Sequence, residues 1–249
     1  MDRESISSAC DYELAGDAFE SVLAGLGFRP PGSVSISPAL VEKIADRIKV
    51  TIRNQCIESE RSRRILAIAV LEDVLDEFDG LMCFQDSPCA SSPFKTRGLV
   101  DFLLGSGSRF HDKPTVKAFV VECSPSLDGL ESLWPQWMGA LSAATNGGDF
   151  SQGAFTDGYR WIFATLTRED PPRSDSSLAC PILRPKPKLV LSMSPCITAV
   201  SLDGGVDVAS LRVVCQYLHV CLGDGFRKLA SSHLLVPLAS TDDDDIDRQ

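Results

Sequence analysis

Two acidic residues lie on neighbouring apolar segments of the chain. Asp101 follows Gly98-Leu-Val, and Glu122 ends the run Ala118-Phe-Val-Val. Two carboxylates that meet at one end of a sheet repel each other unless a cation lies between them, and oxygen ligands favour Mg²⁺ or Mn²⁺. Such a metal activates water and holds a phosphodiester for in-line attack. Asp101 and Glu122 are therefore candidate metal ligands; the alternative is that both acids simply end their strands at the surface.

The surrounding sequence predicts the elements that position these acids. Segments rich in Val and Phe over residues 99–104 and 116–122 are typical of buried strands. Asp157-Gly158 between two apolar runs predicts a hairpin over 153–167. Apolar residues at helical spacing predict helices, whereas the Ser-, Pro- and Cys-rich segment 82–96 predicts mostly loop. We expect helices over 11–26, 38–52, 58–78, 127–145 and 206–222, strands over 189–193 and 197–201, and an irregular segment over 168–188.

The acids, a following helix and the hairpin together resemble one family. Asp101 on one strand, Glu122 at the end of the next, a helix with Gln136 and the run Thr156-Asp-Gly-Tyr-Arg-Trp161 resemble the restriction-endonuclease-like superfamily, the PD-(D/E)XK nucleases. The resemblance covers residues 58–166. It implies an α/β fold with a central mixed sheet flanked by helices, here with an N-terminal helical extension.

The resemblance also implies roles for individual residues. In that family an acid on the first core helix, a strand Asp and a Glu-x-Lys strand end form the metal and catalytic set. Glu60 (or Glu58) matches the helix acid, Asp101 the strand Asp and Glu122 the Glu of Glu-x-Lys. Gln136 stands where several branches carry a Gln that orients the site.

One position departs from the family pattern. Where the family has Lys two residues after the Glu, this chain has Ser124. That Lys stabilises developing negative charge, and losing one such group typically costs about 10² to 10³ in rate. Strand alternation places Lys117 on the opposite face from Glu122. Lys95 and Arg97 share the alternation of Asp101 and could reach the site if that strand starts early, but a turn at Gly98 would break the alternation. The sequence therefore predicts a degenerate or remodelled site.

Two functions follow from this pattern. The first is a nuclease-fold protein with a degenerate or weak phosphodiesterase site that depends on Mg²⁺ or Mn²⁺; if active, it would be an endonuclease or an exonuclease. The alternative is a catalytically inactive nuclease-fold module that binds a protein or a nucleic-acid partner. A third, plainer interpretation is an unrelated intracellular α/β domain. The oligomeric state stays open.

Other reactive residues have simpler interpretations. Arg61, Arg63 and Arg64 form a candidate phosphate contact, but a solvated helix face paired with Glu58 and Glu60 is the favoured interpretation. Cys215, His219 and Cys221 lack a fourth metal ligand nearby, so the two cysteines are expected to be core thiols. We expect Cys123 to be a buried strand thiol, and Trp137 and Trp161 to lie in the core.

Composition limits the class of protein. The 249 residues are 44% hydrophobic and 23% charged, with a mean hydropathy of +0.03, which fits neither a disordered nor a membrane protein. The net charge of −10 disfavours a protein that coats nucleic acid. Nine scattered cysteines without a C-x-x-C pair, and no signal-like start, predict an intracellular protein of the cytoplasm or nucleus. We expect an N-terminal helical extension over 1–57, the α/β domain over 58–240 and a disordered acidic tail over 241–249.

Overall fold

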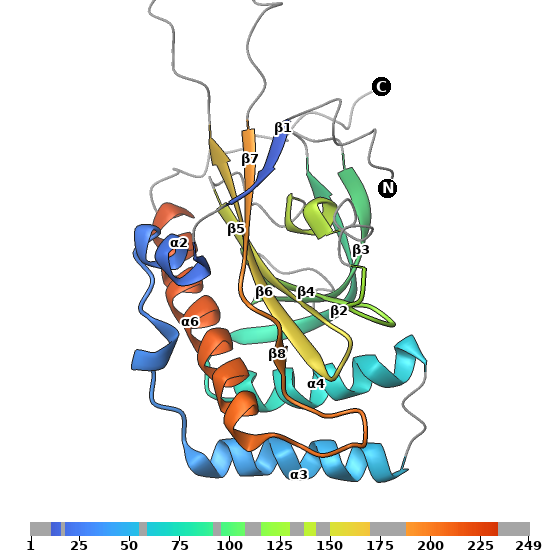
Figure 1. The fold of residues 1–249 in the computed structure, drawn as a ribbon. Helices are drawn as coiled ribbons and strands as arrows, with labels where there is room; N and C mark the ends of the chain where they lie inside the picture. The colour runs from blue at the N-terminus through green and yellow to red at the C-terminus, as the bar shows by residue number, and fades with distance from the viewer. Residues whose placement is uncertain are drawn as a thin grey trace, which may run out of the picture.

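The fold is a mixed sheet with helices on both faces (Figure 1). The computed structural model describes residues 11–15, 18–54, 59–91, 96–107, 116–129, 137–142, 150–169 and 188–233. The helices are α2 (Phe19–Gly25), the short 3₁₀ helix η1 (Pro31–Ser33), α3 (Pro38–Asn54), α4 (Glu60–Leu75), a helical segment at 137–142 and α6 (Val208–His233). The strands are β1 (Asp11–Leu14), β2 (Leu81–Ser91), β3 (Thr96–Ser106), β4 (Val116–Cys123), β5 (Phe150–Thr156), β6 (Arg160–Glu169), β7 (Lys188–Met193) and β8 (Ile197–Thr198).

The sheet runs in the order β1-β7-β6-β5-β4-β3-β2, with β8 paired to β6. Strands β2, β3 and β4 form an antiparallel meander, and β4 then pairs in parallel with β5. The hairpin β5–β6 and the pair β6–β7 are antiparallel, and β1 closes the edge parallel to β7. The predicted α/β class with a central mixed sheet is therefore confirmed, as are the two predicted strands that carry the acids and the predicted hairpin.

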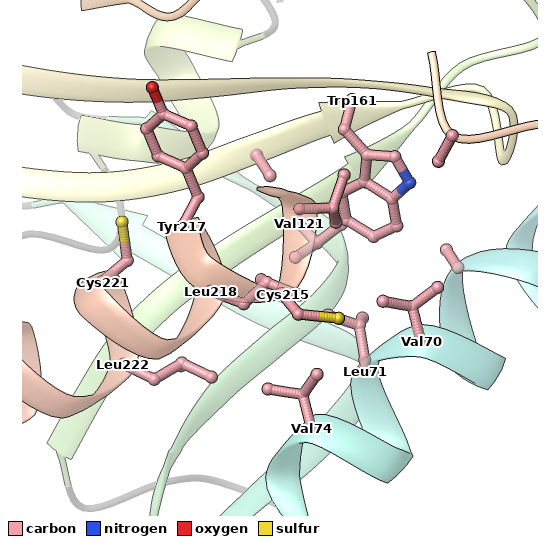
Figure 2. Packing of buried hydrophobic residues seen from close by; sticks show 14 of the residues in the cluster. Val70, Leu71, Val74, Val121, Trp161, Cys215, Tyr217, Leu218, Cys221 and Leu222 are labelled. Atoms are coloured by element: carbon pink, nitrogen blue, oxygen red, sulfur yellow. The ribbon is translucent and has the colours of Figure 1, made fainter. Parts of the chain in front are cut away.

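One face of the sheet holds the larger core. Figure 2 shows side chains from α4, α6 and the sheet meeting there, with Leu71 and Val74 of α4 pointing toward Cys215 and Leu222 of α6. Helix α3 joins this cluster through residues that repeat at helical spacing, such as Val41, Ile44 and Ile48. Because α3 buries its apolar face in the same core, it packs as part of the domain.

The other face is covered in the described part by the helical segment 137–142. Trp137 stacks on Phe155 of β5 with ring centroids 3.6 Å apart, and Met138 and Leu141 join the same cluster. Trp137 and Trp161 are almost fully buried, as the sequence predicts. Alternation along β5 sends Ala154 to the α4 and α6 face and Phe155 to this one.

The helix starts follow ordinary capping rules. Helix α3 begins at Pro38, whose missing N–H costs nothing in a first turn. Helix α4 begins after Ser59, whose hydroxyl accepts from the backbone N–H of Ser62 while Ser62 bonds back to Ser59. Asp207 accepts from the backbone N–H groups of Ala209 and Ser210 and caps α6.

Two sequence predictions are wrong about element type. Residues 11–14 form β1 rather than a helix, because pairing with β7 outweighs the local helical spacing. Residues 81–91 form strand β2 rather than a loop. Pro88 is tolerated in β2 because this strand lies at the edge of the sheet, where one side needs no backbone donor.

Three further predictions differ in their boundaries. The helix expected from 127 does not start there, because Asp128 and Gly129 form a turn in which the Ser126 hydroxyl accepts from the N–H of Asp128. The strand expected over 197–201 is only the two-residue β8, and α6 starts at Val208 and runs past Leu222 to His233. Strand β3 begins at Thr96 and continues through Gly98, which is the early start that the sequence left open. The predicted irregular segment at 168–188 mostly lies outside the described residues, and the acidic tail lies wholly outside them.

Candidate functional site

Polar residues gather where β4 and β5 end beside the first turns of α4. The hairpin loop after β5 packs directly on this helix: a Cβ added to Gly158 would lie 3.0 Å from the carbonyl oxygen of Arg63. The guanidinium of Arg63 lies 5.4 Å from the ring centre of Tyr159 in the same loop. Since ligands of α/β sheets commonly bind outside the carboxyl ends of parallel strands, this end of the β4–β5 pair is the natural place for a site.

Asp101 binds the end of β4 through its side chain. The β3–β4 register is continuous from Phe102↔Val121 to Leu104↔Phe119, and Asp101 lies just beyond it. There its Oδ2 accepts from the backbone N–H of Cys123 at 2.7 Å. The carboxylate thus takes a donor that lies past the last backbone pair of β3 and β4.

Arg64 of α4 provides the positive charge beside Asp101. Its Nη1 lies 3.4 Å from Oδ1 of Asp101, and its Nη2 donates to the carbonyl oxygen of Asp101 at 3.3 Å. Nη2 also donates to Oδ1 of Asp86 at 2.8 Å, and the guanidinium lies 5.3 Å from the ring centre of Phe102. One arginine therefore neutralises carboxylates from two adjacent strands.

Asp86 occupies an unusual backbone position. In the β2–β3 ladder it lies between the pairs Gln85↔Phe102 and Ser87↔Val100. Asp101 lies between the same two pairs on β3, so the two acids are opposite each other. The φ of Asp86 is +46°, in the left-handed region that Asp tolerates better than most residues. The sequence did not indicate Asp86 as a site residue, because its segment reads as a loop.

Burial sets the protonation of the central groups. Desolvation raises the pKa of Asp101; the N–H of Cys123 and the charge of Arg64 lower it, and Asp86 raises it. Desolvation also raises the pKa of the Cys123 thiol well above its ordinary value, and the charge of Asp101 adds to this. Arg64 lowers the pKa of Cys123, whereas Glu122 and Glu60 raise it. The thiol is therefore protonated at neutral pH and poorly suited to act as a nucleophile, in agreement with the sequence interpretation.

The other predicted site residues take different positions. Glu122 is 4% exposed on β4, and alternation directs it to the face of the segment 137–142, next to Phe155 of β5. Glu60 is the exposed first residue of α4. Both contribute to the electrostatic environment of Cys123, as does Asp101. Gln136, the alternative helix acid Glu58 and Lys95 lie outside the described residues.

Ser124 stands at the position where the family pattern has Lys. It is 8% exposed, its N–H donates to the carbonyl oxygen of Thr156 at 2.9 Å and its hydroxyl donates to that of Ser126 at 2.7 Å. Ser124 therefore ties the end of β4 to its surroundings and presents no positive charge. Within the described ranges, no three His, Cys, Asp or Glu side chains lie close enough together to hold a metal ion.

The hairpin loop forms a second ionic cluster. Asp157 is 1% exposed and accepts from the backbone N–H groups of Tyr159 and Arg160. Its Oδ2 binds the Arg160 guanidinium, which also donates to Asp128 at 2.8 Å. Arg63 lies 4.0 Å from the same Asp157 oxygen. The turn signal Asp157-Gly158 located this loop in the sequence, but the ionic role of Asp157 depends on partners far along the chain.

The ion pairs of the α4 arginines differ from the predicted ones. We expected Arg63 and Arg64 to pair with the helix acids Glu58 and Glu60. Their ionic partners among the described residues are instead Asp157, Asp86 and Asp101, all from the sheet and its hairpin. The prediction was wrong for Glu60, because sequence spacing reports neighbours on one helix and not carboxylates that the fold brings to it. Glu58 lies outside the described residues.

Two thiols of α6 lie in the core. Cys215 and Cys221 are buried free thiols in the α6 core, and burial raises the pKa of Cys215 to about 12. His219 lies beside Phe78, with ring centroids 4.9 Å apart. These positions confirm the prediction that the two cysteines are core thiols.

Two further observations describe the chain as a whole. Among the described helices, none combines the length and apolarity needed to cross a bilayer. No protein-family model matches the sequence, and no curated protein matches it at a significant level.

Proposed function

We propose that this chain is a PD-(D/E)XK-like nuclease-fold module whose site is degenerate and which acts by binding a partner rather than by cleaving phosphodiesters. The observation that carries this proposal is the contact of Arg64 with Asp101 and Asp86. An arginine here supplies the positive charge that the family resemblance assigns to a divalent metal. The order of helix acid, strand Asp and strand-end Glu supports the nuclease-like part of the proposal.

The donor set around Asp101 does not fit a metal ion. Oδ2 of Asp101 accepts from the Cys123 N–H, and Oδ1 faces the guanidinium of Arg64. A divalent cation at Asp101 would have to displace Arg64 or lie beside it, and like charges at such distances repel. Ser124 also lacks the charge with which Lys stabilises the transition state.

One observation favours a second candidate, a weak phosphodiesterase that depends on Mg²⁺ or Mn²⁺. Glu60, Asp101 and Glu122 come from three separate elements, yet the charge of each raises the pKa of the same thiol, Cys123. The acids that the resemblance groups together therefore all act on one thiol, although within the described residues they do not form a three-ligand group for a metal ion.

The charge of the chain indicates which class of partner it binds. The chain has a net charge of −10, and Arg63, Arg64 and Arg160 near the site are each ion-paired with carboxylates. Arginines that are already neutralised contribute little to phosphate binding. These charges favour a protein partner over a nucleic acid, in the cytoplasm or nucleus. The five cysteines described as free are compatible with such a reducing compartment.

A cleavage assay separates the two candidates. The full chain is incubated with DNA and RNA substrates in Mg²⁺ or Mn²⁺, beside the variant D101A/E122A. The proposal expects wild type to cleave no faster than the double variant. Cleavage that the double variant abolishes would establish the second candidate and overturn the first.

A further inference from the structure

An exposed leucine lies on β3, two residues before Asp101 of the candidate site. Leu99 is 69% exposed, whereas Val100 and the apolar residues 102–104 of the same strand are buried. The cross-strand partner of Leu99 on β2 is Pro88, which is exposed as well. Two apolar side chains thus lie next to each other and open to solvent.

Strand alternation places this apolar pair on the same face of the sheet as Arg64. Val100 packs in the cluster of the opposite face, and Asp101 contacts Arg64 of α4. Because side chains alternate along a strand, Leu99 and Asp101 both point to the α4 side. The exposure of Leu99 shows that α4 does not cover this part of the face. We name the set that gathers here the Leu99 patch, which consists of Asp86, Pro88, Leu99 and Asp101.

The carboxylates of the Leu99 patch favour a positively charged ligand. Asp86 and Asp101 share the guanidinium of Arg64, so two negative charges face one positive charge. The side chain of Asp86 is 62% exposed, whereas that of Asp101 is 15% exposed. A cation from outside can therefore reach Asp86 while Arg64 stays beside Asp101.

The neighbouring charges of α4 do not offset this excess. Glu60 and Arg61, both exposed in the first turn, carry opposite charges. Arg63 lies 4.0 Å from the buried Asp157 of the hairpin loop. A nucleic acid would bring phosphates to the patch, and a second copy of the chain in a symmetric contact would bring the same two acids. Both would meet like charge there.

We propose that the Leu99 patch binds a protein segment that carries an apolar side chain next to a lysine or an arginine. The apolar side chain covers Leu99 and Pro88, and the cation pairs with Asp86. An apolar anchor with a charged group at its edge is a common arrangement in protein interfaces. This inference rests on the proposed function, because it names the surface and the class of partner for the same site.

Selection from a displayed library of random peptides, with the full chain as the immobilised target, tests the surface. We expect the selected peptides to be enriched in apolar residues adjacent to Lys or Arg. Their affinity should fall about tenfold on L99S, which removes the apolar contact. D86N keeps a residue that tolerates a φ of +46° but removes the charge, and it should weaken binding about two- to fivefold.

The matched control is L202S. Leu202 is 94% exposed and lies between β8 and α6, so this substitution should leave peptide affinity unchanged. Because Leu99 and Leu202 are both exposed, each variant should keep the Tm of wild type within about 2 °C. Equal losses of affinity for L99S and L202S, enrichment of acidic peptides, or no peptide that binds wild type would overturn the proposal.

Sedimentation and DNA or RNA binding test the other possible occupants of the Leu99 patch. A dimer of wild type that L99S dissociates would assign the patch to a second copy of the chain, and nucleic-acid binding that L99S weakens would assign it to nucleic acid. Either result would overturn the proposal. Peptides that bind wild type and L99S equally would refute the patch but leave partner binding as the function, which the cleavage assay with D101A/E122A tests separately.

Discussion

Arg64 and Asp101 form the central contact of the candidate site. Nη1 of Arg64 lies 3.4 Å from Oδ1 of Asp101, and Nη2 donates to the carbonyl oxygen of the same residue at 3.3 Å. Because Nη2 also donates to Asp86, the arginine joins α4 to strands β2 and β3 at once. A half-buried carboxylate is stabilised by a compensating charge, and here a side chain of the protein supplies it.

Replacing Arg64 should destabilise the fold and expose its acidic partners. R64Q removes the positive charge that Asp86 and Asp101 share. We expect the free energy of unfolding, measured in urea, to fall by about 1–3 kcal/mol. The same loss in R61Q would contradict the account, because Arg61 is an exposed residue of the same helix and should change stability by no more than about 0.5 kcal/mol. In the double variant R64Q/D101N the two effects should not add, since each removes the same contact.

Stability should depend on pH through Asp101. Burial raises its folded-state pKa above the ordinary 3.8, so the folded state holds a proton more tightly than the unfolded state. Lowering the pH from 7 towards about 4 should therefore stabilise wild type relative to D101N. The measurement is the urea midpoint of both proteins at each pH in this range. The difference between the two midpoints isolates Asp101, because every other titrating group is present in both proteins.

Asp203 provides the control for that pH series. The hydroxyl of Ser201 and the N–H of Gly205 lower its pKa, so its contribution to stability has the opposite sign. Wild type should lose stability relative to D203N as the pH falls. Parallel trends for D101N and D203N would refute the assignment of a raised pKa to Asp101.

The hairpin loop should be sensitive to one methyl group. Gly158 has φ of +83°, and a Cβ there would lie 3.0 Å from the Arg63 carbonyl oxygen. G158A therefore combines backbone strain with a clash against α4, and we expect a loss of about 2–4 kcal/mol in chemical unfolding. Gly80 is a matched control, since its φ is +79° but a Cβ would meet nothing within 4 Å. G80A should cost about 1–2 kcal/mol, and equal losses would show that the loop does not press on α4.

Asp73 should hold α3 against α4. Its buried carboxylate accepts from Lys43 at 2.9 Å and lies 3.4 Å from Arg47, both on α3. D73A leaves these partners half-exposed and able to reach water, so we expect a loss of about 1–3 kcal/mol rather than the larger cost of a fully buried pair. Thermal unfolding of D73A and of D76A provides the comparison, because Asp76 is exposed and should scarcely matter. A larger loss from D76A would contradict this role.

Local sequence signals predicted the elements that carry the site. The Val- and Phe-rich runs around Asp101 and Glu122 located β3 and β4, and Asp157-Gly158 located the hairpin. Each of these signals is contained in a few consecutive residues. Strand β2 was missed because Pro88 and its Ser neighbours resemble a loop, and an edge position in the sheet makes them acceptable.

The partners of the acids could not be read from the sequence in the same way. Arg64 and Asp101 are separated by 37 residues, and Arg64 and Asp86 by 22. Helical spacing suggested Glu60 as a partner for α4 arginines, since it lies one turn away along the chain. Only the packing of α4 against the meander decides that Asp86 and Asp101 take Arg64 instead.

The most direct test of the proposed function is a calorimetric titration of the full chain with Mg²⁺ and Mn²⁺, beside D101A/E122A and R64Q. If Arg64 occupies the position of the metal charge, wild type should show no binding at millimolar metal, and R64Q should gain binding that the further change D101N removes. Binding by wild type that D101A/E122A abolishes would contradict the account and identify Asp101 and Glu122 as working metal ligands.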